Sequence, residues 1–131
     1  MMIVDSREKK WDHIRKYFDE HGVEYAVHKL DVGDYMNSNN VSIVVDRKKT
    51  LQELCSNLQK GEGNIMRFTR EAARAKEAIV RLIVLIEGTS CRTVKDVISW
   101  QSKYSKHSGR WLNDKMFKLR SEERFSRNAE T

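Results

Sequence analysis

Apolar residues follow two spacings at the start of the chain, and each spacing predicts a different element. Ile3 and Val4 predict a short buried strand. A helix that turns one face inward is predicted next, from apolar residues at three- and four-residue steps: Trp11, Ile14, Tyr17 and Phe18. Asp5 and Glu8, three residues apart, resemble a capping box that opens this helix, and Gly22 is expected to end it.

The next segment favours strands. Residues 23–30 alternate weakly between apolar and polar side chains, and the turn-forming residues 37–40 predict a hairpin. Along its second strand, apolar side chains alternate up to the sequence Asp46-Arg47-Lys48. Because successive side chains of a strand point to opposite faces, Asp46 and Lys48 are expected on one face and Arg47 on the other.

Helices dominate the rest of the chain. Thr50 and Glu53 form a capping box for a helix that is expected to bury four residues: Leu51, Leu54, Cys55 and Leu58. A longer helix should turn these residues inward: Ile65, Phe68, Ala72, Ala75 and Ile79. The apolar run 82–86 is typical of a central strand covered on both faces.

Two further helices are expected near the end of the chain. Thr93 and Asp96 form a capping box for a helix that packs through Val94, Val97 and Ile98. Ser108 is expected to cap the last helix. The predicted order is β-α-β-β-β-α-α-β-α-α, which indicates an α/β fold with a mixed central sheet flanked by helices.

Residues 120–131 break the apolar pattern, with one aromatic residue and no burial period. They can also be back-translated, in one frame, to a common sequencing-adapter oligonucleotide. We therefore interpret 1–119 as a single domain, incomplete at its C-terminus, and 120–131 as a non-native tail, with an ordinary polar tail as the alternative.

The composition of the chain indicates its cellular environment and the class of its binding partners. The net charge of +6 and the pI of about 9.4 favour a polyanionic partner, of which nucleic acid is the commonest. There is no signal peptide and no apolar run of about 18 residues, so a cytoplasmic protein without membrane contact is expected. Cys55 and Cys91 are expected to be free thiols, and neither Cys nor His spacing suggests zinc.

Two carboxylates and a lysine carry the candidate chemistry. Gly33-Asp34 is followed, after eleven intervening residues, by Asp46-Arg47-Lys48. Carboxylates can hold a hard divalent cation such as Mg²⁺. A lysine beside them can orient an attacking water or stabilise charge on a phosphate. Turn and edge roles for Asp34 and Asp46 remain an alternative, although buried carboxylates at strand ends are costly without a partner or a metal.

These motifs, with the opening Val4-Asp5-Ser6-Arg7-Glu8, resemble the nuclease domain of the XPF-type structure-specific endonucleases, within the PD-(D/E)xK superfamily. The resemblance implies the restriction-endonuclease-like form of the α/β fold and a Mg²⁺- or Mn²⁺-dependent DNA endonuclease. It also implies branched, flapped or junction DNA as substrate, and a homodimer as a further possibility. Small single-domain versions occur in phages and bacterial mobile elements, where they would serve DNA repair or recombination, and the chain is most similar to those.

The resemblance assigns roles residue by residue. Asp34 and Asp46 match the metal-binding carboxylates, Lys48 the lysine of the active centre and Arg47 the adjacent arginine, while Asp5 and Glu8 match acidic positions close to the site. Two departures stand out. Asp46 replaces the family's usual glutamate, and the later acidic position falls on Gln52, with Glu53 next to it, so both are candidate metal ligands.

Bland alternatives stand beside several of these roles. Asp5, Glu8 and Glu53 have spacings that also suit helix capping, and Arg47 could serve as a structural ion-pair partner. Arg67, Arg70 and Arg74 form one helical stripe that can meet a phosphate backbone, or a solvated face with internal ion pairs. Arg7 is a further candidate DNA contact. The alternative to a nuclease is a non-catalytic DNA-binding module of the same fold.

Overall fold

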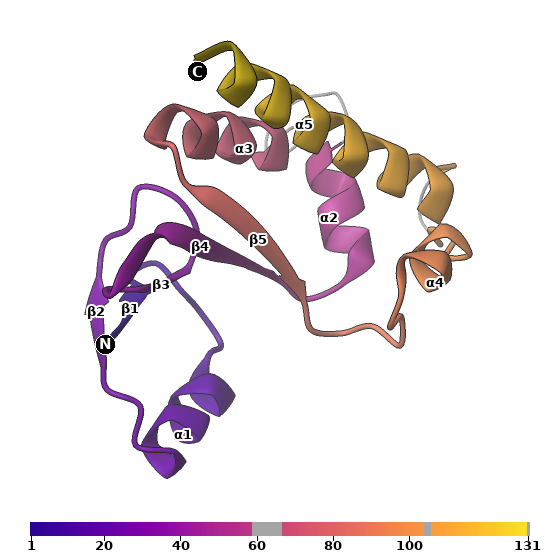
Figure 1. The fold of residues 1–131 in the computed structure, drawn as a ribbon. Coiled ribbons are helices and arrows are strands. Elements are labelled where there is room, and N and C mark those ends of the chain that lie inside the picture. The colour runs from indigo at the N-terminus through magenta and orange to yellow at the C-terminus, as the bar shows by residue number, and fades with distance from the viewer. Residues whose placement is uncertain (59–66, 104–105, 131) are drawn as a thin grey trace. The chain divides into compact units, whose positions relative to one another are not determined.

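The structure, a computed structural model, describes residues 1–58, 67–103 and 106–130, and the side chains of residues 120–130 lie outside that description. Its elements follow the predicted order (Figure 1). The first six are β1 (Met2–Asp5), α1 (Asp12–Glu20), β2 (Tyr25–His28), β3 (Tyr35–Asn37), β4 (Asn40–Lys48) and α2 (Leu51–Leu58). They are followed by α3 (Arg67–Ala78), β5 (Arg81–Ile86), α4 (Val94–Ile98) and α5 (Gly109–Glu130).

The five strands form one sheet in the order β2-β1-β3-β4-β5. β1 pairs with β2 in parallel and with β3 in antiparallel orientation, and β3 and β4 form the predicted antiparallel hairpin. The sheet is therefore mixed, as predicted. The chain divides into two compact units, the first made of Met1–Arg47 with Ala73–Leu85 and the second of Lys48–Ala72 with Ile86–Thr131.

The first unit has an apolar cluster on each face of its sheet. Trp11, at the start of α1, packs with Val4 and Tyr35 on one face, and Ile14, Phe18 and Val45 add to this cluster. On the other face, Ala75 of α3 packs against Val32 and Val44, together with Leu82 of β5. Neighbouring residues of β4 thus serve opposite faces, as strand periodicity requires.

The first helix begins later than expected. α1 starts at Asp12, and the prediction that Asp5 and Glu8 cap it is wrong. The Asp5 side chain accepts the backbone N–H of Leu30 at 2.9 Å, while the Glu8 N–H donates to the Asp5 carbonyl oxygen at 3.0 Å in a turn. Gly22 follows the helix end with a φ of 64°, as predicted, but Tyr17 is exposed and stacks on His21.

Strand β5 is at an edge of the sheet, so the prediction of a central strand covered on both faces is wrong. Its side chains alternate in burial, and Ile83 and Leu85 are 44% and 48% exposed. The run is apolar throughout, but one face of the strand packs against α3 and the other meets solvent. An apolar run cannot by itself reveal which neighbours will cover it.

Helix α3 ends in a left-handed residue rather than continuing inward. Ile79, predicted to be buried, is 68% exposed and has a φ of 57°. The Val80 N–H donates to the Ala75 carbonyl at 3.0 Å and the Ile79 N–H to the Lys76 carbonyl at 3.1 Å, which is the Schellman pattern. Phe68 and Ala75 are buried as predicted, and Ile65 lies outside the described residues.

The second unit takes its buried apolar residues mainly from α2, all of them as predicted: Leu51, Leu54, Cys55 and Leu58. The Thr93–Asp96 capping box is present in both directions, and the Ser108 hydroxyl accepts the Trp111 N–H at 3.2 Å. Val94 is exposed, so its predicted packing role is wrong. Cys55 and Cys91 are free thiols, and α5 continues to Glu130.

No helix among the described residues is long and apolar enough to cross a membrane.

Candidate functional site

Asp34 is fixed against strand β4 by its backbone and by its side chain. Its N–H donates to the Val45 carbonyl oxygen at 2.7 Å, and its Oδ2 accepts the Arg47 N–H at 2.7 Å. Both partners flank Asp46. Asp34 is therefore held beside the stretch of β4 that carries Asp46.

Gly33 makes this approach possible. It has a φ of 77°, and a Cβ at this position would lie 3.0 Å from the Val44 Cβ and 3.2 Å from the Val45 carbonyl oxygen. A side chain here would be strained and would push the turn away from β4. The glycine of the Gly33-Asp34 pair thus allows the Asp34 N–H to reach Val45.

Asp46 is buried, with 3% of its surface exposed. It lies two positions after Val44, so both side chains point to the sheet face that carries Ala75 of α3. Burial of a charged carboxylate costs free energy, and hydrogen bonds or a nearby cation must offset that cost.

Glu8 is a third acid close to this point. Burial raises the pKa of the Glu8 carboxyl, the Asp34 charge raises it further, and the Tyr35 hydroxyl and the Arg47 guanidinium oppose that rise. The Tyr35 hydroxyl is buried and does not reach full hydrogen-bond geometry, although it lies near enough to Glu8 for each group to affect the other. Burial, and then Glu8, raise the pKa of Tyr35 far above its ordinary value, so this hydroxyl stays protonated.

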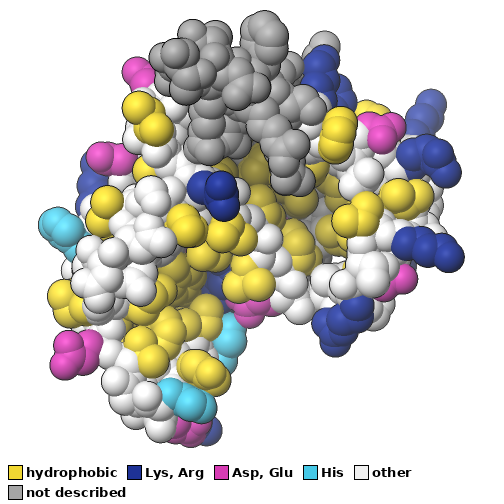
Figure 2. All heavy atoms as spheres, in the orientation of Figure 1, with side chains coloured by type: hydrophobic (Ala, Val, Ile, Leu, Met, Phe, Trp, Pro, Cys, Tyr) yellow, Lys and Arg dark blue, Asp and Glu magenta, His cyan; other side chains and the backbone are white. Residues whose placement is uncertain are grey.

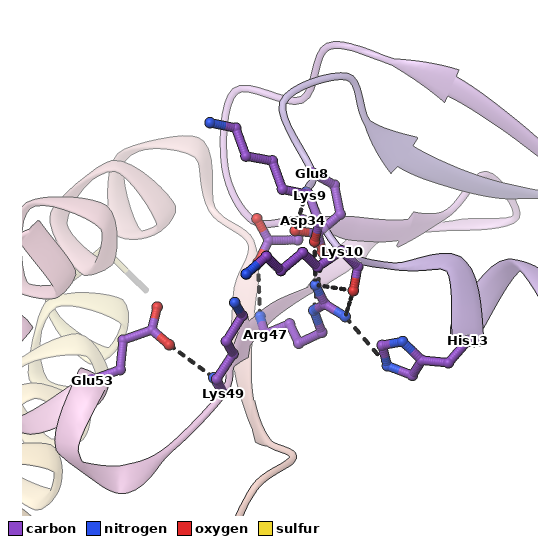
Figure 3. A network of polar contacts seen from close by, with 8 residues as sticks. All are labelled: Glu8, Lys9, Lys10, His13, Asp34, Arg47, Lys49 and Glu53. Carbon is purple, nitrogen blue, oxygen red and sulfur yellow. Dashed lines mark hydrogen bonds and ion pairs between the residues drawn. The ribbon is translucent and has the colours of Figure 1, made fainter.

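Arg47 points to the opposite face from Asp46, as the strand period predicts. Its guanidinium donates to the carbonyl oxygens of Lys9 at 2.7 Å and Lys10 at 3.3 Å, lies 3.5 Å from the His13 ring, and forms an ion pair with Glu8 at 3.3 Å (Figure 3). The interpretation of Arg47 as a structural ion-pair partner is confirmed. Arg47 fixes the turn before α1, in which Lys10 has a φ of 52°.

Asp5 and Arg7 form a second polar contact group. The Arg7 Nε donates to Asp5 Oδ2 at 3.0 Å, and its Nη2 donates to the Leu30 carbonyl oxygen at 2.7 Å. Burial disfavours ionisation of Asp5, but its hydrogen bonds from the Leu30 N–H and from Arg7 outweigh this and lower the pKa of Asp5. Asp5 therefore ties the end of β1 to the segment after β2. Arg7 remains largely exposed, which leaves its predicted DNA contact sterically open.

Lys48 belongs to the second unit, where its side chain is almost wholly buried. Its Nζ donates to the Oδ1 of Asn57 on α2 at 2.9 Å and lies 5.9 Å from the centre of the Phe68 ring. The sequence prediction overlooked Asn57. Its signal was present, since Asn57 stands three residues after Leu54, on the face of α2 that is otherwise apolar.

Gln52 and Glu53, the candidate extra metal ligands, each have a contact inside the second unit. The Gln52 amide oxygen accepts the Ser102 hydroxyl and its Nε2 donates to the Ser56 hydroxyl at 3.3 Å. The Glu53 carboxylate accepts the Lys49 N–H at 2.8 Å (Figure 3). The Glu53 N–H donates to the Thr50 hydroxyl at 3.1 Å. The Thr50 hydroxyl thus accepts a first-turn N–H as the capping box predicts, whereas the Glu53 carboxylate accepts the N–H of Lys49, one residue before the cap. The metal roles of Gln52 and Glu53 stay predictions.

The arginines of α3 face solvent. Arg67, Arg70 and Arg74 are all exposed on this helix. On the face drawn in Figure 2, lysine and arginine side chains lie at several places between apolar and polar groups. An exposed arginine stripe fits contacts to phosphate, and the DNA role of these residues stays a prediction.

The acidic residues fit a loosely held cation better than a closed metal cage. Among the described residues, no three His, Cys, Asp or Glu side chains converge as a metal-binding group. Mg²⁺ is commonly bound through one or two carboxylates, with water and substrate phosphates completing its shell. No hydrogen bond from a described residue reaches Asp34 Oδ1, so this oxygen and the neighbouring Asp46 suit that mode.

The fold is shared with a solved structure. The chain superimposes on "XPF from Aeropyrum pernix" with a TM-score of 0.67 at 24% sequence identity. The match covers 93% of this chain and 52% of the other, so the chain spans about half of that protein's length. A search of curated proteins finds no match.

The model of the ERCC4 domain matches residues 4–126, and the chain therefore belongs to the ERCC4 domain family. The predicted resemblance to XPF-type nuclease domains is confirmed, and so is the predicted α/β fold with its mixed sheet.

Proposed function

We propose that this chain is a Mg²⁺- or Mn²⁺-dependent DNA endonuclease that hydrolyses phosphodiester bonds at branched, flapped or junction DNA. Its biological setting would be DNA repair or recombination in a phage or mobile element, in the cytoplasm, with a homodimer as a further possibility. The observation that supports the proposal is the pair of hydrogen bonds that tie Asp34 to β4 on either side of Asp46, one to the Val45 carbonyl oxygen and one from the Arg47 N–H.

The residues divide into three roles. Asp34 and Asp46 would hold the metal, which when bound supplies an activated water and neutralises charge on the phosphate. Lys48 would orient the attacking water or stabilise the negative charge that develops on the phosphate oxygens. Arg47 and Glu8 would keep the turn before α1 in place beside the acids, and the exposed arginines would meet the DNA backbone.

Cleavage of defined substrates tests the proposal. Duplex, flap, fork and four-way junction DNA are incubated with the protein in Mg²⁺ or Mn²⁺, and products are resolved on denaturing gels. We expect a branched substrate to be cut. Asp34→Ala and Asp46→Ala should each lower the rate by about 10²-fold or more while DNA affinity and fold are kept, because removal of a group that stabilises transition-state charge has an effect of that order.

Asp31→Ala is the matched control for these variants. Asp31 is an exposed carboxylate in the same loop as Asp34, and its loss should leave cleavage unchanged. Metal-dependent cutting by the Asp46→Ala protein at the wild-type rate would refute the assignment of the site. Calorimetric titration with Ca²⁺ gives an independent measure, since Asp34→Ala should remove binding that Asp31→Ala retains.

One observation favours the alternative of a non-catalytic DNA-binding module. The Gln52 amide oxygen, at the position where the family pattern expects an acid, accepts the Ser102 hydroxyl and brings no charge to a metal. A module of this kind would bind flaps or junctions with the same affinity in EDTA and in Mn²⁺, and would cut neither. Cleavage that disappears on adding EDTA would exclude it.

A further inference from the structure

A buried polar pair fixes the lysine of the Asp46-Arg47-Lys48 sequence. Lys48 and Asn57 are only 4% and 7% exposed, and the Lys48 Nζ donates to the Asn57 Oδ1 at 2.9 Å. Both residues lie in the second unit, at the end of β4 and in the last turn of α2. This bond joins two side chains that the sequence separates by nine positions.

The burial of the pair means that the Lys48 ammonium needs partners inside the protein. An ammonium group removed from water needs acceptors, because burial of an uncompensated charge is costly. Asn57 supplies an amide oxygen, and the face of Phe68 lies 5.9 Å from the Nζ, within the range of a cation–π contact. Leu54 and Leu58, the neighbours of Asn57 on α2, are buried apolar residues. Asn57 is thus a polar group on an apolar helix face, directed at a lysine.

The backbone of the lysine is anchored as well. The Lys48 carbonyl oxygen accepts the Glu87 N–H at 3.0 Å, and the Lys49 carbonyl accepts the Gly88 N–H at 2.6 Å. A Cβ on residue 88 would lie only 2.4 Å from the Lys49 oxygen, so this approach needs glycine. The lysine is therefore held at its backbone by the segment after β5 and at its Nζ by α2, which leaves its long side chain little rotational freedom.

We propose that Asn57 is a positioning residue that holds the Lys48 ammonium in the orientation needed for phosphodiester cleavage. The proposal rests on the proposed function, in which Lys48 orients water or stabilises charge on the phosphate. Asn57 itself touches neither DNA nor metal in this scheme. It acts through Lys48, as an outer partner that orients a group of the active centre.

Variants of Asn57 test this in two ways. Asn57→Leu keeps a side chain branched at Cγ and removes the acceptor, whereas Asn57→Asp keeps an oxygen at the same distance from the helix. We expect Asn57→Leu to lower kcat by about 10- to 100-fold with DNA affinity unchanged, the range seen when an outer-shell partner is lost. Asn57→Asp should retain most of the activity. Asn57→Ala takes the place of Asn57→Leu if the latter does not fold.

Cys55→Ala is the control for packing. Cys55 is fully buried on the same helix, so its truncation perturbs α2 while leaving the Asn57 acceptor in place. Its kcat should stay at the wild-type value. An equal loss of kcat in Cys55→Ala and Asn57→Leu would overturn the proposal, because Asn57 would then act only through the packing of α2.

A double-mutant cycle separates positioning from a general structural effect. If Asn57 acts through Lys48, Asn57→Leu should cause no further loss of rate in a Lys48→Ala background. The same fold loss with and without Lys48 would overturn the proposal. So would wild-type cleavage by both Asn57→Leu and Asn57→Ala.

A measurement without DNA or metal distinguishes failure of this inference from failure of the proposed function. In ¹H–¹⁵N spectra, a buried, hydrogen-bonded Lys48 ammonium should give a resonance protected from rapid exchange, present in wild type and Cys55→Ala and lost in Asn57→Leu. The proposed function fails if the wild-type protein does not cut DNA, or if Lys48→Ala cuts at the wild-type rate. In either case this signal still reports whether Asn57 holds Lys48. An unchanged resonance in Asn57→Leu would overturn the inference.

Discussion

Asp5 and Asp34 each accept a backbone N–H, and they differ in what else their carboxylates contact. Asp5 uses both oxygens within the fold, through the Leu30 N–H and the Arg7 guanidinium. Asp34 uses Oδ2 for the Arg47 N–H, and its Oδ1 receives no hydrogen bond from a described residue. At the scale of the residue, the Asp5 carboxylate is thus used for structural contacts, whereas the Asp34 carboxylate keeps one oxygen available to a ligand.

Asp5→Asn should lower stability in a way that depends on pH. Contacts that lower the pKa of an acid in the folded state stabilise the protein above the ordinary value, here 3.8, and this contribution is lost as the pH falls through the lowered value. At pH 7 we expect Asp5→Asn to reduce the free energy of unfolding by about 1.5–3 kcal/mol, the range for hydrogen bonds to a charged group. Urea titrations from pH 7 to pH 3 measure it.

The difference between Asp5→Asn and wild type should shrink as the pH falls below 3.8, because the unfolded wild-type chain then takes up a proton at Asp5 and the ionic contribution to stability declines. Asp31→Asn, in an exposed position of the following loop, serves as control and should match wild type throughout. A penalty for Asp5→Asn that stays constant from pH 7 to pH 3 would contradict an ionic role for Asp5.

Local signals describe most of the elements well. The hairpin between β3 and β4, the Thr93 capping box and the inward residues of α2 are all found as predicted. These signals involve residues within four positions of each other, or turn chemistry that few residue types supply. The helix end at Ile79 is different, since a β-branched residue occupies the left-handed position that usually takes glycine.

Ile79→Gly should stabilise the protein. A left-handed conformation costs a residue with a Cβ about 1–2 kcal/mol, and the Ile79 side chain is exposed, so little buried area is lost on replacement. We expect a gain of about 1 kcal/mol in the free energy of unfolding, measured by urea denaturation. Ile79→Ala keeps the Cβ and should gain much less. A loss of stability in Ile79→Gly would show that the exposed side chain makes a contact that outweighs the strain.

At the scale of the whole molecule, the order of strands in the sheet determines what each apolar residue does. β5 is the edge strand of the sheet, and its successive side chains alternate between partly buried and exposed positions. Leu82 packs with the cluster of Val32, Val44 and Ala75, whereas Ile83 lies on the other face and is exposed. A central strand would bury both.

Substitution by lysine at these neighbouring positions tests the edge placement. Ile83→Lys should change the free energy of unfolding by no more than about 0.5 kcal/mol, as is usual for surface positions. Leu82→Lys should destabilise by several-fold more, because it places a charge in the apolar cluster. Thermal and urea unfolding of the two variants compare them directly. Equal destabilisation by both would mean that β5 is covered on each face.

The candidate site was predictable in part, for reasons that differ between residues. Asp34, Asp46 and Lys48 could be predicted because strand periodicity and the order of short motifs are visible in the sequence alone. The environment of Arg47 could not, since its guanidinium binds carbonyl oxygens of Lys9 and Lys10, and a backbone acceptor leaves no trace in the residue type. Asn57 was overlooked, although a polar residue on an apolar helix face was a usable signal.

The sequence by itself determined the order of the elements, the faces of β4 and the family to which the motifs point. These properties depend on local periodicity, capping and turn chemistry, which act between residues close together in the chain. Only the tertiary structure decided that β5 lies at an edge, that Asp5 binds Leu30 rather than a helix end, and that Lys48 meets Asn57. These contacts depend on which elements become neighbours, and that follows from packing and from the need of buried polar groups for partners.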